Sequence, residues 1–286
     1  MRALAIALLA AACMPSFDSV SEIRDLRVLA VQAEPPEAQF DQNGVQDVTV
    51  RVLAVDPVPR SLARIDGRLC APTDSRRCET GPRLELPPLV GPAGGEFSWV
   101  VRLPRAVVDF ALGNDALRGL GGIRVMLSLD VNDGDPHGVV FASKNVIYSP
   151  VGGTPNHNPL MTGLHLTKDT SDAGKWSPGD PPLALGPGAP IGLRPLLAAD
   201  AIEEYDTTDL RGNRVHLREQ LSYSFFTEPG AEVDRDGADE PVDGVAPPEG
   251  LTRITAKRRG GAGKLYVVVR DGRGGQSWMT VDWLAN

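Results

Sequence analysis

Hydrophobic and polar residues alternate in short stretches along most of this chain. Val48, Val50 and Val52 share one face of an extended segment, whereas Thr49 and Arg51 lie on the other. A period of two residues is typical of a strand with one buried face. The same period predicts strands that bury Phe97, Trp99, Val101 and Leu103; Ile123, Val125, Leu127, Leu129 and Val131, with Arg124, Ser128 and Asp130 toward solvent; Leu221, Tyr223 and Phe225; Leu265, Val267 and Val269; and Met279, Val281 and Trp283.

Turn sequences separate these strands. The segments "DQNG" at 41–44, "NDGDPHG" at 132–138 and "RDGRGG" at 270–275 contain the Asn, Asp and Gly residues that tight hairpins require. A further strand is expected near 139–148. Residues 104–112 begin with proline and have apolar residues at helical spacing, so we expect one or two helical turns there.

Residues 149–159, "SPVGGTPNHNP", interrupt the pattern with prolines and glycines and show no period. A chain of 286 residues is also long for one domain. We therefore predict a mainly β chain with two sandwich domains, residues 25–150 and 160–286, joined by a linker at 151–159. The second domain opens with a strand near 160–166, and the Gly- and Pro-rich stretch at 176–190 is expected to be a loop or an edge strand.

The start of the chain has a different character. Residues 1–12 carry one positive charge and then an apolar run that is too short to cross a bilayer and ends in small residues, as in a signal peptide. The stretch from Ala10 to Cys13 resembles the bacterial lipobox, in which the cysteine becomes the first residue of the mature chain and carries the lipid. Ala10 stands where leucine is usual. An ordinary cleaved signal with an incidental cysteine is the alternative.

A lipid on Cys13 requires a spacer before the first domain. Residues 13–24 are polar and irregular, so we expect a tether in which nothing packs into a core. By the sorting rule of enteric lipoproteins, Met14 after the cysteine, instead of aspartate, implies the outer membrane.

The net charge limits the classes of binding partner, and the cysteine content indicates the cellular compartment. With 29 Lys and Arg against 37 Asp and Glu, the net charge of −8 provides no basic field for nucleic acid. Cys70 and Cys78 flank a polar turn, and close cysteines in an exported protein form a disulfide. A zinc site would need two more Cys or His residues nearby, and the sequence has none there.

Three stretches resemble a known group of proteins. They are "LRVLAVQAEPPEA" at 26–38, "PNHNP" at 155–159 and "LYVVVRDGRGGQSW" at 265–278. Together they are similar to uncharacterised lipoproteins of myxobacteria and related bacteria. The resemblance implies two immunoglobulin-like β-sandwiches behind a lipobox and implies no activity. Cys70 and Cys78 are too close in sequence to form the inter-sheet disulfide of antibody domains, so we expect apolar packing to hold each sandwich together.

One acidic segment suggests a calcium site. In "EVDRDGADEPVD", Glu232, Asp234, Asp236 and Asp243 occupy positions one, three, five and twelve of a calcium loop, with glycine at position six. Position one is normally Asp, position twelve is normally Glu, and no amphipathic helices flank the segment. A solvated acidic insertion between strands is the alternative.

The sequence contains no recognisable catalytic motif. Its four histidines are scattered without metal-ligand spacing, and Ser277 lacks the following glycine of a nucleophile elbow. We therefore expect a lipid-anchored envelope protein with a structural, interaction or binding role, whose partner is an envelope protein or polysaccharide. The alternatives are a calcium-dependent adhesion or carbohydrate-binding module, and a hydrolase whose acidic pair the sequence does not reveal.

Overall fold

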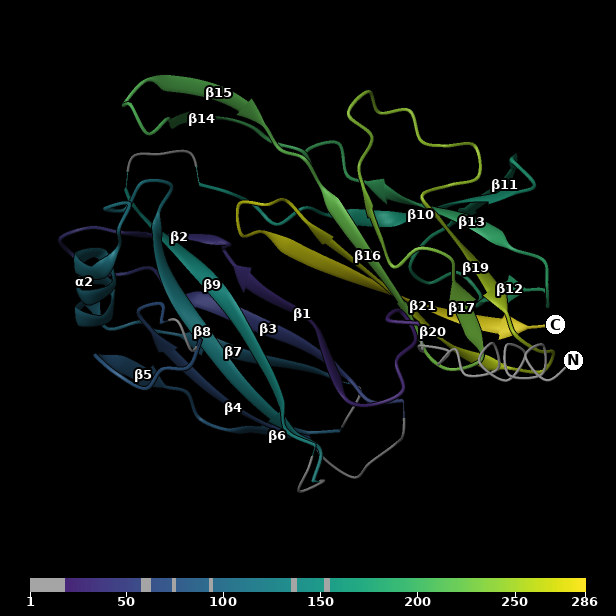
Figure 1. Ribbon diagram of the computed structural model, residues 1–286, viewed down its shortest axis with the longest axis horizontal. Helices are drawn as coiled ribbons and strands as arrows, with labels where there is room; N and C mark the ends of the chain where they lie inside the picture. The colour runs from purple at the N-terminus through teal and green to yellow at the C-terminus, as the bar shows by residue number, and fades with distance from the viewer. Residues whose placement is uncertain (1–18, 58–62, 74–75, 93–94, 135–137, 152–154) are drawn as a thin grey trace, which may run out of the picture.

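The computed structural model describes residues 19–57, 63–73, 76–92, 95–134, 138–151 and 155–286. The N-terminal and C-terminal halves lie side by side, as Figure 1 shows. The elements of the N-terminal half are β1 (Arg27–Glu34), β2 (Glu37–Phe40), β3 (Val48–Val55), β4 (Ala63–Cys70), β5 (Arg83–Glu85), β6 (Leu89–Gly91), β7 (Glu96–Val101), α2 (Arg105–Asn114), β8 (Ile123–Asn132) and β9 (Val140–Pro150). Those of the C-terminal half are β10 (Met161–Lys168), β11 (Ser171–Trp176), β12 (Leu183–Leu185), β13 (Ile191–Leu197), β14 (Glu204–Thr208), β15 (Arg214–Arg218), β16 (Ser222–Thr227), β17 (Ala231–Val233), β18 (Gly237–Asp239), β19 (Thr252–Ala256), β20 (Ala262–Arg270) and β21 (Gln276–Ala285).

One sheet has the same strand order in both halves. One sheet of each half follows the order β2-β9-β8-β4-β5 or β12-β21-β20-β16-β18, and in each the first strand runs parallel to its neighbour. The facing sheets are β1-β3-β7 and β11-β10-β13-β19-β17. Two facing sheets with this strand order, antiparallel apart from that first pair of strands, form an immunoglobulin-like sandwich. The predicted fold class, mainly β with two such sandwiches, is confirmed.

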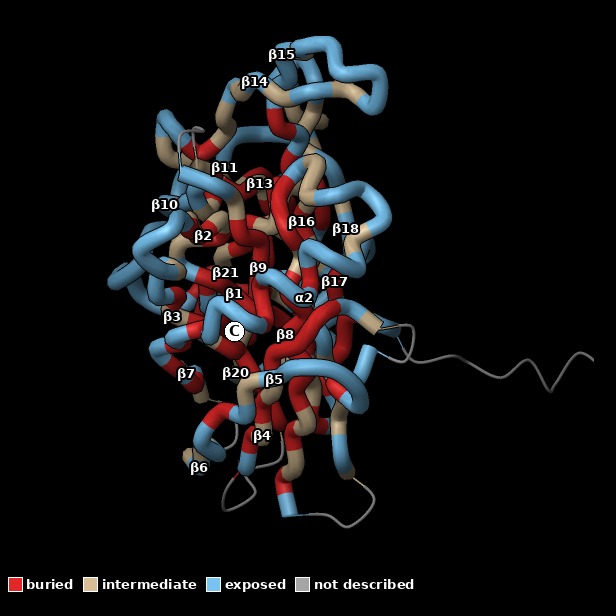
Figure 2. The backbone as a smooth tube through the Cα atoms, turned by 90° about the vertical axis from the view of Figure 1, so that its left-hand side faces the viewer, coloured by how far each residue is buried: buried red, intermediate tan, exposed pale blue. Residues whose placement is uncertain are grey.

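Each half has its own apolar core. The buried residues of one core all lie between Leu26 and Tyr148, and those of the other between Met161 and Ala285. Val48, Val50 and Val52 are fully buried, which confirms the period-two prediction for β3. Figure 2 shows buried segments running along the strands of both halves, whereas the hairpin β14–β15 is largely exposed.

The burial of β8 differs from the prediction at Ser128. The inward-facing residues are buried as expected: Ile123, Val125, Leu127, Leu129 and Val131. Ser128, which we predicted to face solvent, is only 1% exposed. The reason is the position of β8 in the middle of its sheet, where Arg68 of β4 and Ser143 of β9 lie directly opposite Ser128. A strand flanked on both sides loses solvent contact on its outer face as well.

The predicted helix and the predicted turn at 41–44 are present, whereas residues 135–137 of the predicted turn at 132–138 lie outside the described residues. Helix α2 begins after Pro104, as its sequence indicates. The segment at 41–44 forms a turn in which the Asp41 carboxylate accepts hydrogen bonds from the N–H groups of Asn43 and Gly44. Residues 176–190 contain one edge strand, β12, as expected.

A third apolar cluster joins the two halves. It brings Ile23, Leu29, Ala30, Leu53 and Val55 against Tyr266 and Val268, with Phe226 and Trp278 packed around them. Strand β20 is therefore buried on both faces, because its second apolar face covers β1 and β3. Trp278 and Trp283, five residues apart, lie on opposite faces of β21, and Trp283 belongs to the core of the C-terminal half, as predicted.

The expectation that no residue of 13–24 packs into a core is wrong for Ile23. Ile23 is fully buried in this third cluster, and its N–H donates to the carbonyl oxygen of Thr227 at 2.9 Å. Glu22 forms a salt bridge with Lys257 at 2.9 Å. The last part of the segment is thus attached to the C-terminal half, because an isoleucine next to a strand edge gains more from burial than from solvent contact. Residues 1–18, including Cys13, lie outside the described residues.

Candidate functional site

The hairpin turn between β20 and β21 holds Arg273 at the junction of the two halves. The Asp271 Oδ1 atom accepts hydrogen bonds from the N–H groups of Arg273, Gly274 and Gly275 at 2.7, 3.0 and 2.9 Å. Gly272 and Gly274 have φ values of 77° and 116°, which glycine adopts without strain. The predicted hairpin is confirmed, and its geometry directs the Arg273 side chain toward the N-terminal half.

Three carboxylates surround the Arg273 guanidinium. Its nitrogen atoms lie 3.0 Å from Glu219, 3.2 Å from Glu203 and 3.4 Å from Glu37. The Tyr205 ring stacks on the guanidinium, with the ring centroid 3.9 Å from the central carbon. Because Glu37 belongs to β2 and the other groups to the C-terminal half, Arg273 links the two sandwiches.

The segment between the halves joins the same network. The side-chain amide of Asn156 donates to Asp271 at 2.8 Å, and its backbone N–H donates to Glu37 at 3.1 Å. Asn158 donates to the carbonyl oxygen of Ala33 at 2.7 Å and accepts from the N–H of Gln276 at 2.8 Å. The stretches 26–38, 155–159 and 265–278 therefore meet at one place. We call Glu37, Asn156, Glu203, Glu219, Asp271 and Arg273 the junction network.

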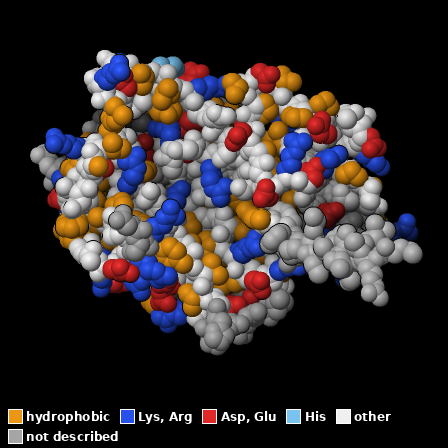
Figure 3. Space-filling model, in the orientation of Figure 1, with side chains coloured by type: hydrophobic (Ala, Val, Ile, Leu, Met, Phe, Trp, Pro, Cys, Tyr) orange, Lys and Arg blue, Asp and Glu red, His pale blue; other side chains and the backbone are white. Residues whose placement is uncertain are grey.

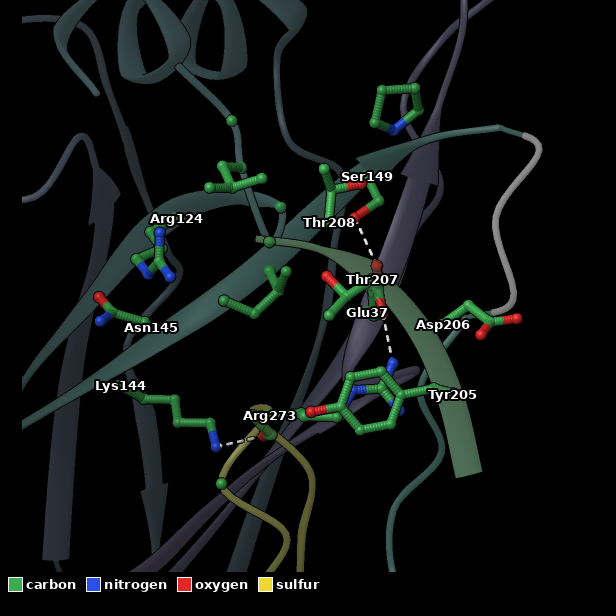
Figure 4. Close-up of a pocket in the computed structure, with 18 residues that line it drawn as sticks. Glu37, Arg124, Lys144, Asn145, Ser149, Tyr205, Asp206, Thr207, Thr208 and Arg273 are labelled. Carbon is green, nitrogen blue, oxygen red and sulfur yellow. Dashed lines mark hydrogen bonds and ion pairs between the residues drawn. The ribbon is translucent and has the colours of Figure 1, made fainter. Parts of the chain in front are cut away.

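A groove opens beside the junction network. Its volume is about 780 Å³, within the range of ligand sites in proteins. Figure 4 shows Arg124, Asn145 and Lys144 on one side of it and Thr207 and Tyr205 on the other. It is lined by Glu37, residues 119–122, Arg124, Lys144, Asn145, Ile147, Ser149, Pro150, residues 205–208 and residues 272–274.

Two cations of the groove form no salt bridge within the described part of the chain. Lys144 donates only to the carbonyl oxygen of Gly274, at 2.6 Å. Burial lowers the pKa of Lys144 to about 8, although the nearby Asp271 carboxylate raises it. Arg124 extends from β8 and has no hydrogen-bonded carboxylate partner among the described residues. Figure 3 shows Lys and Arg side chains gathered over the middle of this face of the molecule.

The residues of the expected calcium loop are not assembled into a ligand set. Asp234 is engaged by Arg253 at 2.7 Å and by the Thr252 hydroxyl at 3.0 Å, and Asp243 accepts the N–H of Val245 at 3.0 Å. Glu232 lies in the short strand β17, and Asp236 contributes its backbone carbonyl to the N–H of Phe225. In the described ranges, no group of three or more His, Cys, Asp or Glu side chains is placed to hold a metal ion.

The predicted disulfide is confirmed. Cys70 at the end of β4 is bonded to Cys78, with 5.5 Å between their Cα atoms, and the pair packs on Met126 of β8. Among the helices that the structure describes, none has the length and apolar character needed to cross a membrane.

Local sequence does not reveal the junction network or the groove. The segment "RDGRGG" predicts only a turn, because a hairpin signature does not show which groups the arginine contacts. The available signal was the continuous apolar run in β20, "KLYVVVR", which indicates a strand covered on both faces.

Comparison with known proteins gives no family. No protein-family model matches the chain, and no curated protein matches it. One solved structure with some similarity is red sea bream transglutaminase, with 16% identity and a TM-score of 0.27 over 93% of this chain and 32% of that one. Another is Escherichia coli alpha-2-macroglobulin activated by porcine elastase, with 11% identity and a TM-score of 0.27 over 94% of this chain and 23% of that one. A third is the N-terminal Ig1-2 module of the Drosophila receptor protein tyrosine phosphatase DLAR (12%, 0.25, 92% and 100%). The chain spans about a third or less of the first two proteins, and TM-scores this low carry no argument about function.

Proposed function

We propose that this chain is a lipid-anchored cell-envelope protein with a binding role, and that the groove beside the junction network is its ligand site. The observation that carries the binding role is the pair of cations, Arg124 and Lys144, in a groove of about 780 Å³ between two sandwiches. A buried or half-buried cation without an anionic partner is costly to a fold, and ligand sites commonly retain such groups for recognition. The lipobox-like sequence that ends at Cys13 supports the anchor, and Met14 after it supports an outer-membrane location.

The anchor is tested by the intact mass and the membrane association of the protein expressed in its bacterial host. We expect a mature chain that begins at Cys13 with added acyl mass and sediments with membranes, and we expect Cys13→Ala to remove both properties. An unlipidated wild-type chain in the soluble fraction would contradict the anchor while leaving the groove untouched.

The groove is tested by blocking it. Asn145 is an exposed residue of β9 that lines the groove, and tryptophan is well tolerated in strands. We expect Asn145→Trp to abolish co-sedimentation of the protein with purified envelope polysaccharide fractions. Asn286→Trp, at the exposed last residue, is the control and should bind like wild type. Equal binding by both variants would exclude the groove as the ligand site.

A further inference from the structure

The charges around the groove are compensated unequally. The carboxylates that line it, Glu37 and Asp206, are already occupied. Glu37 accepts hydrogen bonds from Ser149, Asn156 and Arg273, and Asp206 is paired with Arg214. The cations on the opposite side have no such partners. The lining therefore has three cations, Arg124, Lys144 and Arg273, against two carboxylates, although the chain as a whole is acidic.

Nearby protein groups do not neutralise these two cations. The charge of Arg124 contributes to lowering the pKa of Asp115, after the hydrogen bonds from Gly119 and Leu117. The Asp115 carboxylate accepts those hydrogen bonds from the N–H groups of Leu117 and Gly119 at 3.0 and 2.8 Å. The field of Asp271 reaches Lys144, but the hydrogen bonds of its carboxylate go to Asn156 and to the N–H groups of its own turn. An incoming anion would thus find two cations that no carboxylate of the described residues holds by a hydrogen bond.

The rest of the lining favours a hydroxylated ligand. Asn145, Ser149, Thr207 and Thr208 provide an amide and three hydroxyl groups, and Tyr205 adds an aromatic ring with a phenolic hydroxyl. These groups donate and accept hydrogen bonds with equal ease, which suits sugar hydroxyls. The Tyr205 ring is held in place by its stacking on Arg273, so the polar wall is fixed before a ligand arrives.

We propose that the groove binds an acidic polysaccharide, with one sugar carboxylate at Arg124, a second at Lys144, and the sugar hydroxyls against Asn145, Thr207 and Tyr205. This inference rests on the proposed function, because it specifies the ligand of the same groove. Arg124 lies opposite Ile147, whereas Lys144 lies opposite Leu127, three positions further along the same pair of strands. Each cation therefore binds its own carboxylate through charge-assisted hydrogen bonds.

The test compares two polymers that differ only in charge. Polygalacturonate carries a carboxylate on each ring, and its fully methyl-esterified form has the same backbone without the charges. Binding of each polymer to the full-length protein in detergent is measured by isothermal titration calorimetry at 0.15 M salt. We expect affinity for polygalacturonate to be at least about tenfold higher than for the ester, and we expect Arg124→Gln and Lys144→Gln each to lower it about tenfold, the loss of one charge-assisted contact.

Matched controls separate a site from general attraction. Arg259→Gln and Lys168→Gln remove exposed charges outside the groove and should leave the affinity unchanged. Equal losses in groove and control variants would overturn the proposal, since the polymer would then bind the surface at large. The urea unfolding midpoints of the groove variants are measured as well. Midpoints equal to that of wild type would show that the variants lose affinity without losing stability.

The remaining outcomes distinguish the two proposals. Equal affinity for the acidic and esterified polymers, abolished by Asn145→Trp, would overturn the acidic ligand and leave the groove as a ligand site. Binding of both polymers that Asn145→Trp does not change would remove the groove as well. Absence of binding to polygalacturonate would overturn the inference by itself, whereas the co-sedimentation assay with envelope fractions would still decide the proposed function.

Discussion

Replacing Arg273 by glutamine tests whether the junction network stabilises the two-domain body. The variant removes the positive charge and leaves a shorter, uncharged polar side chain. It leaves Glu37, Glu203 and Glu219 facing one another without a cation, in the region where the halves meet. We expect a large loss of stability, because three carboxylates then repel at short range in a partly dehydrated site.

The exposures of these side chains set the magnitude. The Glu219 side chain is 1% exposed, whereas those of Glu203 and Glu37 are 20% and 19% exposed and that of Arg273 is 17% exposed. Removing one partner of a fully buried ion pair costs about 3–5 kcal/mol. Since two of the carboxylates keep some solvent contact, we expect the low end, about 3 kcal/mol at pH 7.5.

The loss should depend on pH. Burial raises the pKa of Glu219 even with Arg273 present, and removing the arginine raises it further. A carboxyl whose folded pKa lies above its unfolded value destabilises the protein above that pKa, and the cost disappears as falling pH protonates it. We therefore expect the destabilisation by Arg273→Gln to be smaller at pH 5 than at pH 7.5.

The assay is urea unfolding followed by tryptophan fluorescence. Arg102→Gln is the control, because Arg102 also has an ion pair, with Asp47 at 3.0 Å, but is 83% exposed; its loss should cost under about 1 kcal/mol. The double variant Arg273→Gln with Glu219→Gln should recover at least half of the lost stability. A cost of Arg273→Gln no larger than that of Arg102→Gln would refute the reasoning.

Three further predictions concern stability. Leu127→Ala, in the core of the N-terminal half at 0% exposure, should cost about 3 kcal/mol in urea unfolding, whereas a similar cost for Leu210→Ala, 82% exposed, would contradict a core-packing origin. Replacing Cys70 and Cys78 by serine opens a loop with a sequence separation of 8 residues and should cost about 2–3 kcal/mol, measured by thermal unfolding; an unchanged Tm would contradict this. Burial raises the pKa of Asp234, but hydrogen bonds from Arg253 and Thr252 lower it more, so the net pKa is lowered. The stabilisation by this carboxylate is present above about pH 4, its unfolded pKa, and is lost as the pH falls through the folded pKa. Asp234→Asn should therefore destabilise the protein at pH 7, and its difference from wild type in urea unfolding should shrink as the pH falls below about 4.

Much of the β structure could be predicted from local sequence. The valines at 48, 50 and 52, the turn at 270–275 and the proline that starts α2 are local signals, and each leads to the expected element. Such signals are reliable because a strand with one buried face needs a two-residue period, and a tight turn needs residues that adopt positive φ. Cys70 and Cys78 belong with them, because few residues separate the two.

The candidate site could not be predicted in this way. Glu37 and Arg273 are separated by 236 residues in sequence and yet form one ion pair. Neither residue has a distinctive local pattern, since one follows a proline turn and the other lies inside a glycine-rich hairpin. In the acidic stretch 232–243 the local pattern is misleading. Its spacing resembles a calcium loop, but in the tertiary structure Asp234 forms a salt bridge with Arg253.

The sequence by itself determined the class of structure, the two cores and the covalent link between Cys70 and Cys78, because hydrophobic periodicity, turn chemistry and short loop closure all act over a few residues. Only the tertiary structure decided which face of β20 covers β1, where Ile23 packs, and that Arg124 and Lys144 share a groove with Tyr205. These contacts depend on how the two sandwiches pack against each other. That packing involves surfaces formed by residues far apart along the chain, so local sequence patterns do not reveal it.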